Sequence, residues 1–433
     1  MRNPLNFLVG MARFERAASA SRTLRSSQAE PHPVKESTLR RTNIFGKAFF
    51  VCQINPPGVT WPMYSRNAGK LHSGASVFMI RVLVVDDSTF MRHALVSLLE
   101  QDPEIKVAGT ARDGQEALQK AGELDADVMT LDVEMPRLDG LATLQELMKT
   151  HPMPVLMVSS LTESGAESTL KAMEYGALDF ILKTMSNDRD CFGDELRRKV
   201  KAIARKKTIV KLKYRRINHI VQPLAHRSQP SQPADYVQTP CHGPRDLVVI
   251  GVSTGGPPVV QKVLSALPAD LPACILIAQH MPATFTGPFA KRLDSVCKIS
   301  VSEAVNGDKF KNGHAYVCPG GKHIGVRMRG PLPEVAVTDE PRDALYKPTV
   351  NVLMETAGRC LGRRTMGVML TGMGSDGCEG ARILKEKGGC LIAQNEASCV
   401  VYGMPKAVVD ARLANLILDA DDIAQAIIST VKG

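Results

Sequence analysis

A serine, a histidine and an aspartate in the second half of the chain have the residue types and spacing of a nucleophilic hydrolase. Ser253 lies in a Gly-x-Ser-x-Gly frame directly after an apolar run, and His280 and Asp376 follow further apolar runs. Because the carboxyl ends of parallel strands meet at one edge of a sheet, we expect these side chains to emerge together. Ser253 would attack a carbonyl, His280 would take its proton, and Asp376 would hold the imidazole tautomer.

Glycines beside the serine and the aspartate suit an oxyanion site. Gly255 and Gly256 follow the serine, and Gly374 and Gly377 flank the aspartate, where they would let backbone amides approach a developing negative charge. The chain order Ser, His, Asp differs from that of α/β-hydrolases, and the Lys-Ser/Thr of a phosphate-binding P-loop is missing. His323, in "PGGKH", is interpreted as a rim histidine that hydrogen-bonds locally or helps to bind substrate.

A second group of chemically active residues lies in the first half of the chain. Asp86 and Asp87 follow the first apolar run, and Asp132 follows the third. Ser159 ends the fourth run and Lys183 follows the fifth. Carboxylates gathered at one sheet edge repel one another unless a cation joins them, and Mg²⁺ prefers oxygen ligands. We therefore expect a magnesium site here, with a hydroxyl and an ammonium beside it.

These residues require two α/β units to position them. Apolar runs with the length and composition of strands alternate with helical stripes, and the turns between them are short, which favours parallel doubly wound sheets. We predict a (βα)5 domain over 79–184 and a second doubly wound parallel-sheet domain over 245–433. The strands are expected at 81–85, 105–108, 127–131, 155–158 and 180–182, and at 247–250, 274–278, 315–318, 365–370 and 389–393.

Charge and composition separate these domains from a leader and a linker. The formal net charge is +10, of which residues 1–78 carry +8 and residues 186–245 carry +9, so the rest carries −7. Residues 1–78 are predicted to be disordered or a non-native leader, and 185–244 a basic helix and flexible linker. The 10 cysteines form neither Cys-x-x-Cys pairs nor metal-ligand spacings, and no apolar run is long enough for a membrane span.

The first domain resembles a response-regulator receiver domain. The motifs "VVDDS", "LDVEMPRLDG", "VSS" and "ILK" carry the resemblance. It implies that a chemotaxis histidine kinase phosphorylates Asp132, with Mg²⁺ held by Asp86, Asp87 and Asp132. Lys183 would pair with the phosphoryl group, and Ser159 would follow it. The lysine is followed by Thr184, where proline is usual in the family.

The second domain resembles the catalytic domain of chemotaxis protein-glutamate methylesterases. The motifs "IGVSTGGP", "AQHMPATFTGPFAKRL", "YVCPGGKH", "LTGMGSDG" and "VVYGMPKA" carry this resemblance across nearly the whole of 247–433. It implies phosphorylation-activated hydrolysis of glutamate methyl esters on chemoreceptors, often with deamidation of receptor glutamines, and Ser253, His280 and Asp376 as the triad. Met373, through its amide, and Thr254 would bind the oxyanion or substrate.

The departures from the methylesterase pattern are small. "YKPTVN" replaces a more usual Arg-Pro-Ser-Val-Asp, and Asn395 stands where aspartate is common. Neither is expected to touch the triad, although both could alter substrate contacts.

Two other functions fit the sequence less well. A DNA-binding response regulator would need a helix-turn-helix and a basic output domain, and an adaptor without esterase activity would be expected to lack part of the triad. We therefore expect a cytoplasmic enzyme that needs no cofactor for the esterase reaction, binds no nucleic acid and does not insert into membranes.

Overall fold

The computed structural model describes residues 79–433 except 161, 184–188, 207–209, 211–238, 240, 242, 244 and 433. The described residues fall within one compact unit, Gly74–Gly433. The predicted leader lies outside the described residues, as does most of the predicted linker. Within the described part of the chain, no helix has the length and apolar character needed to cross a bilayer.

The first sheet has five parallel strands in the order β2-β1-β3-β4-β5. Each strand is followed by a helix, which confirms the predicted (βα)5 fold class. The fifth helix lies within 185–244, the segment predicted to be a basic helix and linker, and its apolar side chains pack in the core of this sheet. The element bounds are β1 Ile80–Val85, α1 Thr89–Leu99, β2 Ile105–Ala111, α2 Gly114–Glu123, β3 Val128–Asp132, α3 Gly140–Thr150, β4 Val155–Ser159, α4 Glu163–Glu174, β5 Asp179–Leu182 and α5 Arg189–Ala204.

Local capping explains where the first four helices begin. The side chains of Ser88, Asp113, Asp139 and Thr162 each accept a hydrogen bond from a backbone amide in the first turn of the helix that follows. Such caps satisfy donors that have no partner within the helix. Helices α1, α2 and α4 start within four residues of the carboxyl ends of their strands, whereas α3 starts after a longer loop, and the strand ends are left open for a site.

The second sheet has seven parallel strands in the order β14-β13-β12-β6-β7-β9-β8, which confirms the predicted parallel sheet. The chain runs from β6 to β7 on one side and returns to β12 on the other, so the topology switches direction at β6. The bounds are β6 Leu247–Val252, α7 Gly256–Ser265, β7 Cys274–Gln279, α8 Ala283–Val296, β8 Ser300–Glu303, β9 His314–Val317, β10 His323–Arg329, β11 Leu332–Thr338, α9 Val350–Leu361, β12 Thr365–Met369, α10 Cys378–Glu386, β13 Cys390–Gln394, α11 Met404–Asp410, β14 Leu416–Leu418 and α12 Ala420–Lys432.

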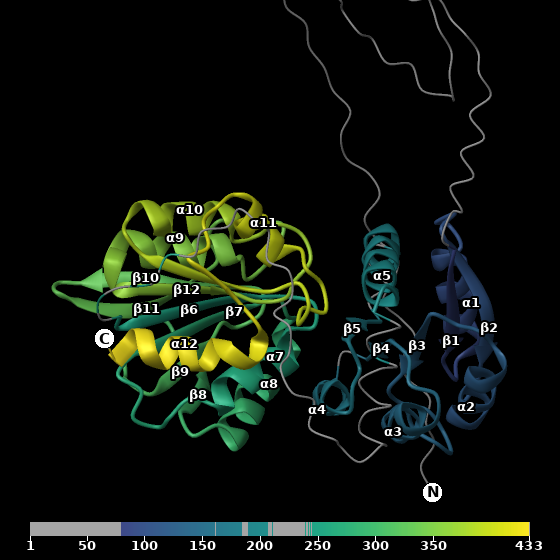
Figure 1. Cartoon of the computed structure of the whole chain (residues 1–433). Coiled ribbons are helices and arrows are strands. Elements are labelled where there is room, and N and C mark those ends of the chain that lie inside the picture. The colour runs from purple at the N-terminus through teal and green to yellow at the C-terminus, as the bar shows by residue number, and fades with distance from the viewer. Residues whose placement is uncertain are drawn as a thin grey trace, which may run out of the picture. The chain divides into compact units, whose positions relative to one another are not determined.

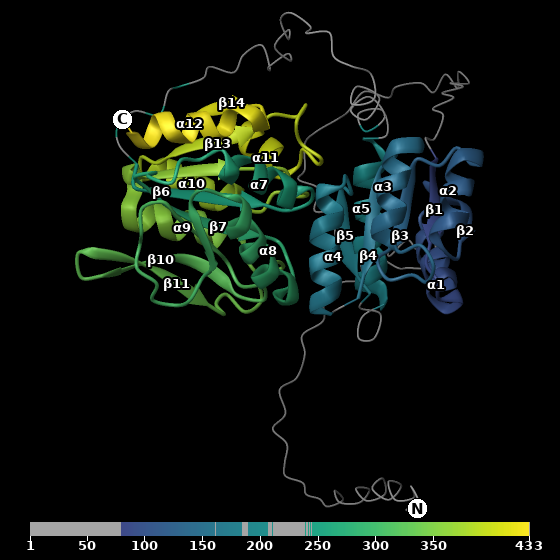
Figure 2. The ribbon, with the colours of Figure 1, turned by 90° about the horizontal axis from the view of Figure 1, so that it is seen from below.

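Helices cover both faces of this sheet (Figures 1 and 2). Alternate residues of β6 point to opposite faces, as strand geometry requires. Val248, Ile250 and Val252 pack in the core that includes α7, α8 and α12, whereas Leu247 and Val249 pack in the core that includes α9, α10 and α11. A strand buried on both sides carries no polar alternation, which is why it reads as one apolar run.

Three strand features were not predicted from the sequence. Strand β8 is short and starts with two serines around one valine, and β14 has only 3 residues. Strands β10 and β11 form a separate antiparallel hairpin, which turns at Gly330 with a φ of 60°. The tip of this hairpin contains charged residues and a proline, so its sequence lacks the apolar pattern expected of a strand.

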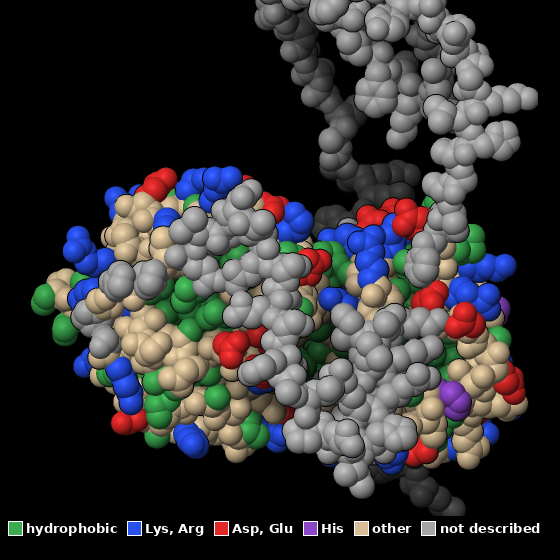
Figure 3. All heavy atoms as spheres, in the orientation of Figure 1, with side chains coloured by type: hydrophobic (Ala, Val, Ile, Leu, Met, Phe, Trp, Pro, Cys, Tyr) green, Lys and Arg blue, Asp and Glu red, His purple; other side chains and the backbone are tan. Residues whose placement is uncertain are grey.

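On the face in Figure 3, basic and acidic side chains are interspersed over the described surface.

Candidate functional site

The three residues of the predicted triad lie at the carboxyl edge of the second sheet. Ser253 follows β6, His280 follows β7, and Asp376 lies between β12 and α10. The turn after the serine requires glycine at position 255, because its φ is 72° and a Cβ atom there would lie 2.4 Å from Val400. The strand-to-helix turn thus holds Ser253 at the topological switch point of the sheet.

The side chains of these residues form a continuous chain of contacts. The Oγ of Ser253 lies 3.1 Å from Nδ1 of His280, and Nε2 of His280 lies 2.8 Å from Oδ2 of Asp376. An ionised carboxylate only accepts hydrogen bonds, so Nε2 carries the proton and Nδ1 is free to accept the serine proton. The ring presents Nδ1 to the serine, the reverse of the usual serine-protease orientation. The predicted assembly of the three side chains is therefore present.

The carboxylate of Asp376 is held at the N-terminus of α9. It accepts hydrogen bonds from the amide of Val350 at 2.7 Å and from the hydroxyl of Thr349 at 2.5 Å, and the amide of Asn351 lies 3.3 Å away. Burial opposes ionisation, but the hydrogen bonds from His280, Thr349 and Val350 outweigh it and lower the pKa of Asp376. The aspartate is thereby kept as the anion that an imidazolium partner needs.

The expectation that "YKPTVN" does not touch the triad is wrong. Thr349 belongs to that segment and contacts Asp376 directly. Its hydroxyl also lies 3.3 Å from the amide of Asn351, as expected of the N-cap of α9. A threonine before an apolar helical stripe is a recognisable cap signal, but the sequence does not reveal which distant carboxylate shares the cap.

Replacing Thr349 with valine should lower the esterase rate about 10-fold, because the hydroxyl that orients Asp376 is lost while the side-chain shape is kept. Serine at the same position retains the hydroxyl and should stay within about twofold of the unmodified chain, since a serine also caps a helix. Turnover of a methyl-ester substrate by the two variants checks this. Equal rates for valine and serine would contradict it.

A cleft of about 450 Å³ lies beside the triad. Ser253, Thr254, His280 and Met373 line it. Thr254 is buried, and its carbonyl oxygen accepts a hydrogen bond from the hydroxyl of Thr371 at 2.9 Å. Thr254 and Met373 are therefore placed beside the nucleophile, and their roles in binding the oxyanion or substrate stay predictions.

The acidic residues of the first domain also come together. One carboxylate oxygen from each of Asp86, Asp87 and Asp132 lies within 4.8 Å of the others. The ammonium of Lys183 lies 2.9 Å from Asp86 and 2.7 Å from Asp132. Asp86 and Asp132 are buried and Asp87 is exposed. Carboxylate oxygens in this number and spacing fit a hard divalent cation such as Mg²⁺.

Burial makes the charges in this cluster costly. It raises the pKa of Asp132 to about 6, although the hydrogen bond and the charge of Lys183 oppose the shift. Burial also disfavours the charged form of Lys183, but its contacts with Asp132 and Asp86 outweigh burial and raise the pKa of the ammonium. The cluster thus has an excess of negative charge that a cation would relieve.

Ser159 lies at the same edge, but its hydroxyl faces α4. It accepts a hydrogen bond from the hydroxyl of Thr169 at 2.9 Å and lies 3.3 Å from the carbonyl oxygen of Gly165. Both partners belong to α4, so the position of the Ser159 hydroxyl is coupled to that helix. The predicted movement of Ser159 toward a phosphoryl group stays a prediction.

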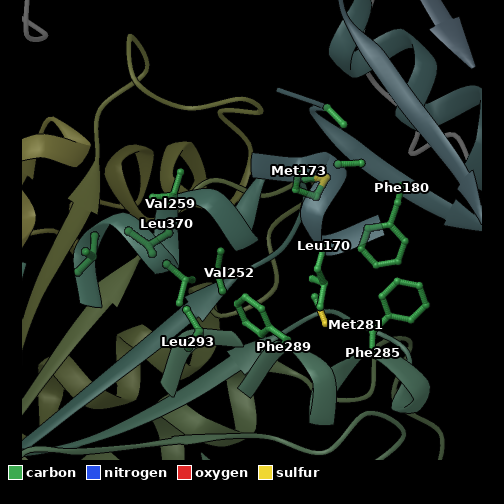
Figure 4. Close-up of a cluster of buried hydrophobic side chains, with 14 of the residues drawn as sticks. Leu170, Met173, Phe180, Val252, Val259, Met281, Phe285, Phe289, Leu293 and Leu370 are labelled. Atoms are coloured by element: carbon green, nitrogen blue, oxygen red, sulfur yellow. The ribbon is translucent and has the colours of Figure 1, made fainter. Parts of the chain in front are cut away.

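Residues of the first domain contact the second domain close to the triad. The ring of Phe180 stacks on that of Phe285 with centroids 4.5 Å apart, and Glu174 pairs with Arg292 at 2.6 Å. Figure 4 shows the shared apolar cluster, in which Leu170 and Met173 from α4 lie with side chains of the second domain. Leu182, Glu195 and Arg198, among others, line the same cleft as Ser253.

Comparison with known proteins matches both halves of the chain. Residues 82–190 match the model of the response regulator receiver domain, and residues 248–427 match that of the CheB methylesterase. The fold thus belongs to the class of proteins that join a receiver domain to a methylesterase domain.

Curated relatives cover both domains together. A protein-glutamate methylesterase/protein-glutamine glutaminase of Lawsonia intracellularis is 53% identical over 82% of this chain and 99% of its own length. One from Nitratidesulfovibrio vulgaris is 56% identical over 81% of this chain and 99% of its length, and one from Pyrococcus abyssi is 43% identical over 82% and 94%. The chain belongs to the protein-glutamate methylesterase/protein-glutamine glutaminase family.

Solved structures match each domain separately. The catalytic domain of the Thermotoga maritima CheB methylesterase is 37% identical and covers 43% of this chain and 98% of its own, with a TM-score of 0.42. The response regulator domain of Thermotoga maritima CheB is 47% identical and covers 29% of this chain and 97% of its own, with a TM-score of 0.28.

Proposed function

We propose that this protein hydrolyses glutamate 5-O-methyl esters on chemoreceptors, deamidates receptor glutamines, and is activated by phosphorylation of Asp132. The observation that carries the proposal is the contact chain from Ser253 through His280 to Asp376, at the edge of a cleft. The names of the relatives describe the same two activities. A cytoplasmic location is part of the proposal and agrees with the cysteines of the described residues, which are all free thiols.

Acylation begins at Ser253. Its Oγ attacks the carbonyl carbon of the methyl ester while Nδ1 of His280 accepts the hydroxyl proton over the 3.1 Å contact. Asp376 stabilises the imidazolium through the Nε2 hydrogen bond. Amides near Met373 and Thr254 would stabilise the oxyanion, a contribution worth about 10²–10³ in rate per donor. Collapse of the tetrahedral intermediate expels methanol, which takes its proton from Nδ1.

Deacylation repeats the chemistry with water. His280 accepts a proton from a water molecule that attacks the glutamyl ester of Ser253, and the serine leaves with the proton returned to its oxygen. The product is a free glutamate side chain. A glutamine side chain would follow the same two steps and release ammonia instead of methanol.

Control of this reaction is assigned to the receiver domain. Asp86, Asp87 and Asp132 would hold Mg²⁺, which supplies positive charge that offsets the incoming phosphoryl group. The carboxylate of Asp132 would accept that group from a chemotaxis histidine kinase, and Lys183 is in position to pair with it. The apolar contacts around Phe180 and Phe285 support a receiver that restricts the cleft until it is phosphorylated.

A route for this control runs through Ser159. Its hydroxyl is bonded to Thr169 of α4, and α4 also carries Glu174 and the apolar side chains that meet α8. Drawing Ser159 toward a phosphoryl group would break its bond to Thr169 and shift the population of α4 positions. The receiver would then bind the catalytic domain less tightly.

A fragment that begins at Arg245 should release methanol several-fold faster than the unphosphorylated full chain, because the receiver no longer restricts the cleft. The fragment should also be indifferent to a phosphodonor. Initial rates with methylated receptor membranes check this, after circular dichroism has verified that the fragment is folded. A folded fragment no faster than the unphosphorylated parent would contradict an inhibitory receiver.

A charge exchange tests the same contact within the full chain. Glu174→Arg places like charges opposite Arg292 and should raise the unphosphorylated rate, whereas the double variant Glu174→Arg/Arg292→Glu restores an opposite pair and should lower it again. The effect is modest, since a surface pair contributes at most about 1 kcal/mol. Identical rates for the single and double variants would contradict a role for this contact.

The proposed reaction itself is tested with two substrates. Membranes that contain receptors methylated with a labelled methyl group should release labelled methanol, and membranes with unmodified receptor glutamines should release ammonia. If neither product forms in the presence of a phosphodonor and Mg²⁺, the proposed function is wrong.

A further inference from the structure

The imidazole of His280 is covered on one face by an aromatic ring that the mechanism above does not use. The rings of His280 and Tyr346 are stacked, with centroids 4.4 Å apart and planes inclined by 12°. Tyr346 lies between β11 and α9 and lines the cleft beside the triad. Its place in the sequence, just before "KPTVN", gives no sign of this contact.

The segment that carries Tyr346 is anchored at both ends by one buried histidine. Nε2 of His323 donates a hydrogen bond to the carbonyl of Pro341 at 3.1 Å, and its Nδ1 accepts one from the amide of Thr349 at 3.1 Å. Lys347 adds a third anchor, because its carbonyl accepts from the amide of Gly321 at 3.1 Å. The interpretation of His323 as a rim histidine with local hydrogen bonds is wrong, because the side chain is buried and its partners lie 18 and 26 positions away in the sequence.

His323 can fill this position only as a neutral imidazole. It is 0% exposed, and burial lowers its pKa despite the hydrogen bond to Pro341. The neutral form has one donor and one acceptor nitrogen, which match the carbonyl and the amide. Residues 341–349 are therefore held as a closed loop, and the position of the Tyr346 ring is defined.

The stack restricts a motion that the two hydrogen bonds of His280 allow. Those bonds leave from opposite sides of the ring, at Nδ1 and Nε2, so the ring can still tilt about the line that joins them. A parallel ring against its face opposes the tilt. The restriction matters most after acylation, because the oxygen of Ser253 is then esterified and has no proton to share with Nδ1.

We propose that Tyr346 is a positioning residue for His280 that acts through its stacked ring and not through its hydroxyl. The proposal rests on the proposed function, in which His280 is the general base. The electron-rich face of the ring also favours the positive imidazolium that forms during each step. Tyr346 therefore stabilises the state in which His280 is an imidazolium, and it affects substrate binding less.

Two substitutions separate the ring from the hydroxyl. Tyr346→Phe keeps the ring and should retain kcat within about twofold, whereas Tyr346→Leu removes it and should lower kcat about 10- to 100-fold, the range expected for a misplaced catalytic group. KM should stay within about twofold in both variants. Asp343→Ala, an exposed position of the same loop, serves as the matched control and should behave as the unmodified chain.

The reaction of Ser253 with a fluorophosphonate provides a second rate that does not depend on receptor membranes. Labelling should slow in Tyr346→Leu and not in Tyr346→Phe. The two measurements together separate the proposed function from the role of Tyr346. Absence of methanol release by the unmodified chain contradicts the proposed function. Unchanged labelling of Tyr346→Leu contradicts the role of Tyr346.

A spectroscopic signature distinguishes positioning from a general structural effect. The ring current of Tyr346 should shift the carbon-bound proton signals of the His280 imidazole upfield, and a His280→Ala variant identifies those signals. The shift should persist in Tyr346→Phe and disappear in Tyr346→Leu, while other histidine signals stay in place. The proposal is overturned if Tyr346→Leu keeps its kcat, or if Tyr346→Phe loses as much as Tyr346→Leu.

Discussion

Replacing Ser253 with alanine should abolish methanol release, with a fall of at least about 10³-fold in kcat. Alanine keeps the backbone of the turn and removes only the oxygen that lies 3.1 Å from Nδ1 of His280. No acyl-enzyme can then form, so the loss does not depend on the substrate or on the phosphorylation state. Initial rates with labelled receptor membranes measure the effect.

The control for this variant is Ser265→Ala in the same domain. Ser265 ends α7, and its hydroxyl donates to the carbonyl oxygen of Lys262 in the same helix. It should retain the full rate, and both variants should melt within a degree or two of the unmodified chain. Methanol release by Ser253→Ala at a rate near that of Ser265→Ala would end the serine-esterase account.

Replacing Asp132 with asparagine should prevent phosphorylation entirely. A small phosphodonor such as acetyl phosphate, with Mg²⁺, should place about one acid-labile phosphoryl group on the unmodified chain and none on the variant. The carboxylate of Asp132 supplies the attacking oxygen and is also a predicted ligand of the cation. The substitution therefore removes the nucleophile and weakens the cation site. Chelation of Mg²⁺ should have the same effect on the unmodified chain.

Asp139→Asn is the matched control for this substitution. Asp139 caps α3, and asparagine caps a helix as well as aspartate, so the fold should be unaffected. The control should be phosphorylated to the same extent as the unmodified chain. Undiminished phosphate on Asp132→Asn would place the phosphoacceptor elsewhere.

Much of both sites could be predicted because their residues follow buried parallel strands. Apolar runs such as 247–252 carry a strong signal, and the residue after each run must lie at the carboxyl edge of the sheet. Ser253 and His280 were located in this way, as were Asp132 and Lys183. The position of a residue at the end of a strand depends only on the topology of the sheet. The alternation of strands and helices in the sequence indicates that topology.

The supporting residues could not be predicted because their contacts depend on loops. Thr349 reaches Asp376 across 27 positions of sequence, and Tyr346 reaches His280 through a segment that is anchored by His323. No periodic pattern specifies the path of that segment. The same limit applies to the β10–β11 hairpin and to the orientation of Ser159 toward α4.

The central claim is that a serine esterase is controlled by a phosphorylated receiver on the same chain. It is tested most directly by the initial rate of methanol release from methylated receptor membranes, measured for the full chain and Asp132→Asn with and without a phosphodonor and Mg²⁺. We expect a low basal rate for both, a several-fold rise for the full chain when the donor is added, and no rise for Asp132→Asn. A full chain that releases no methanol with the donor, or that releases it equally fast without one, would contradict the account.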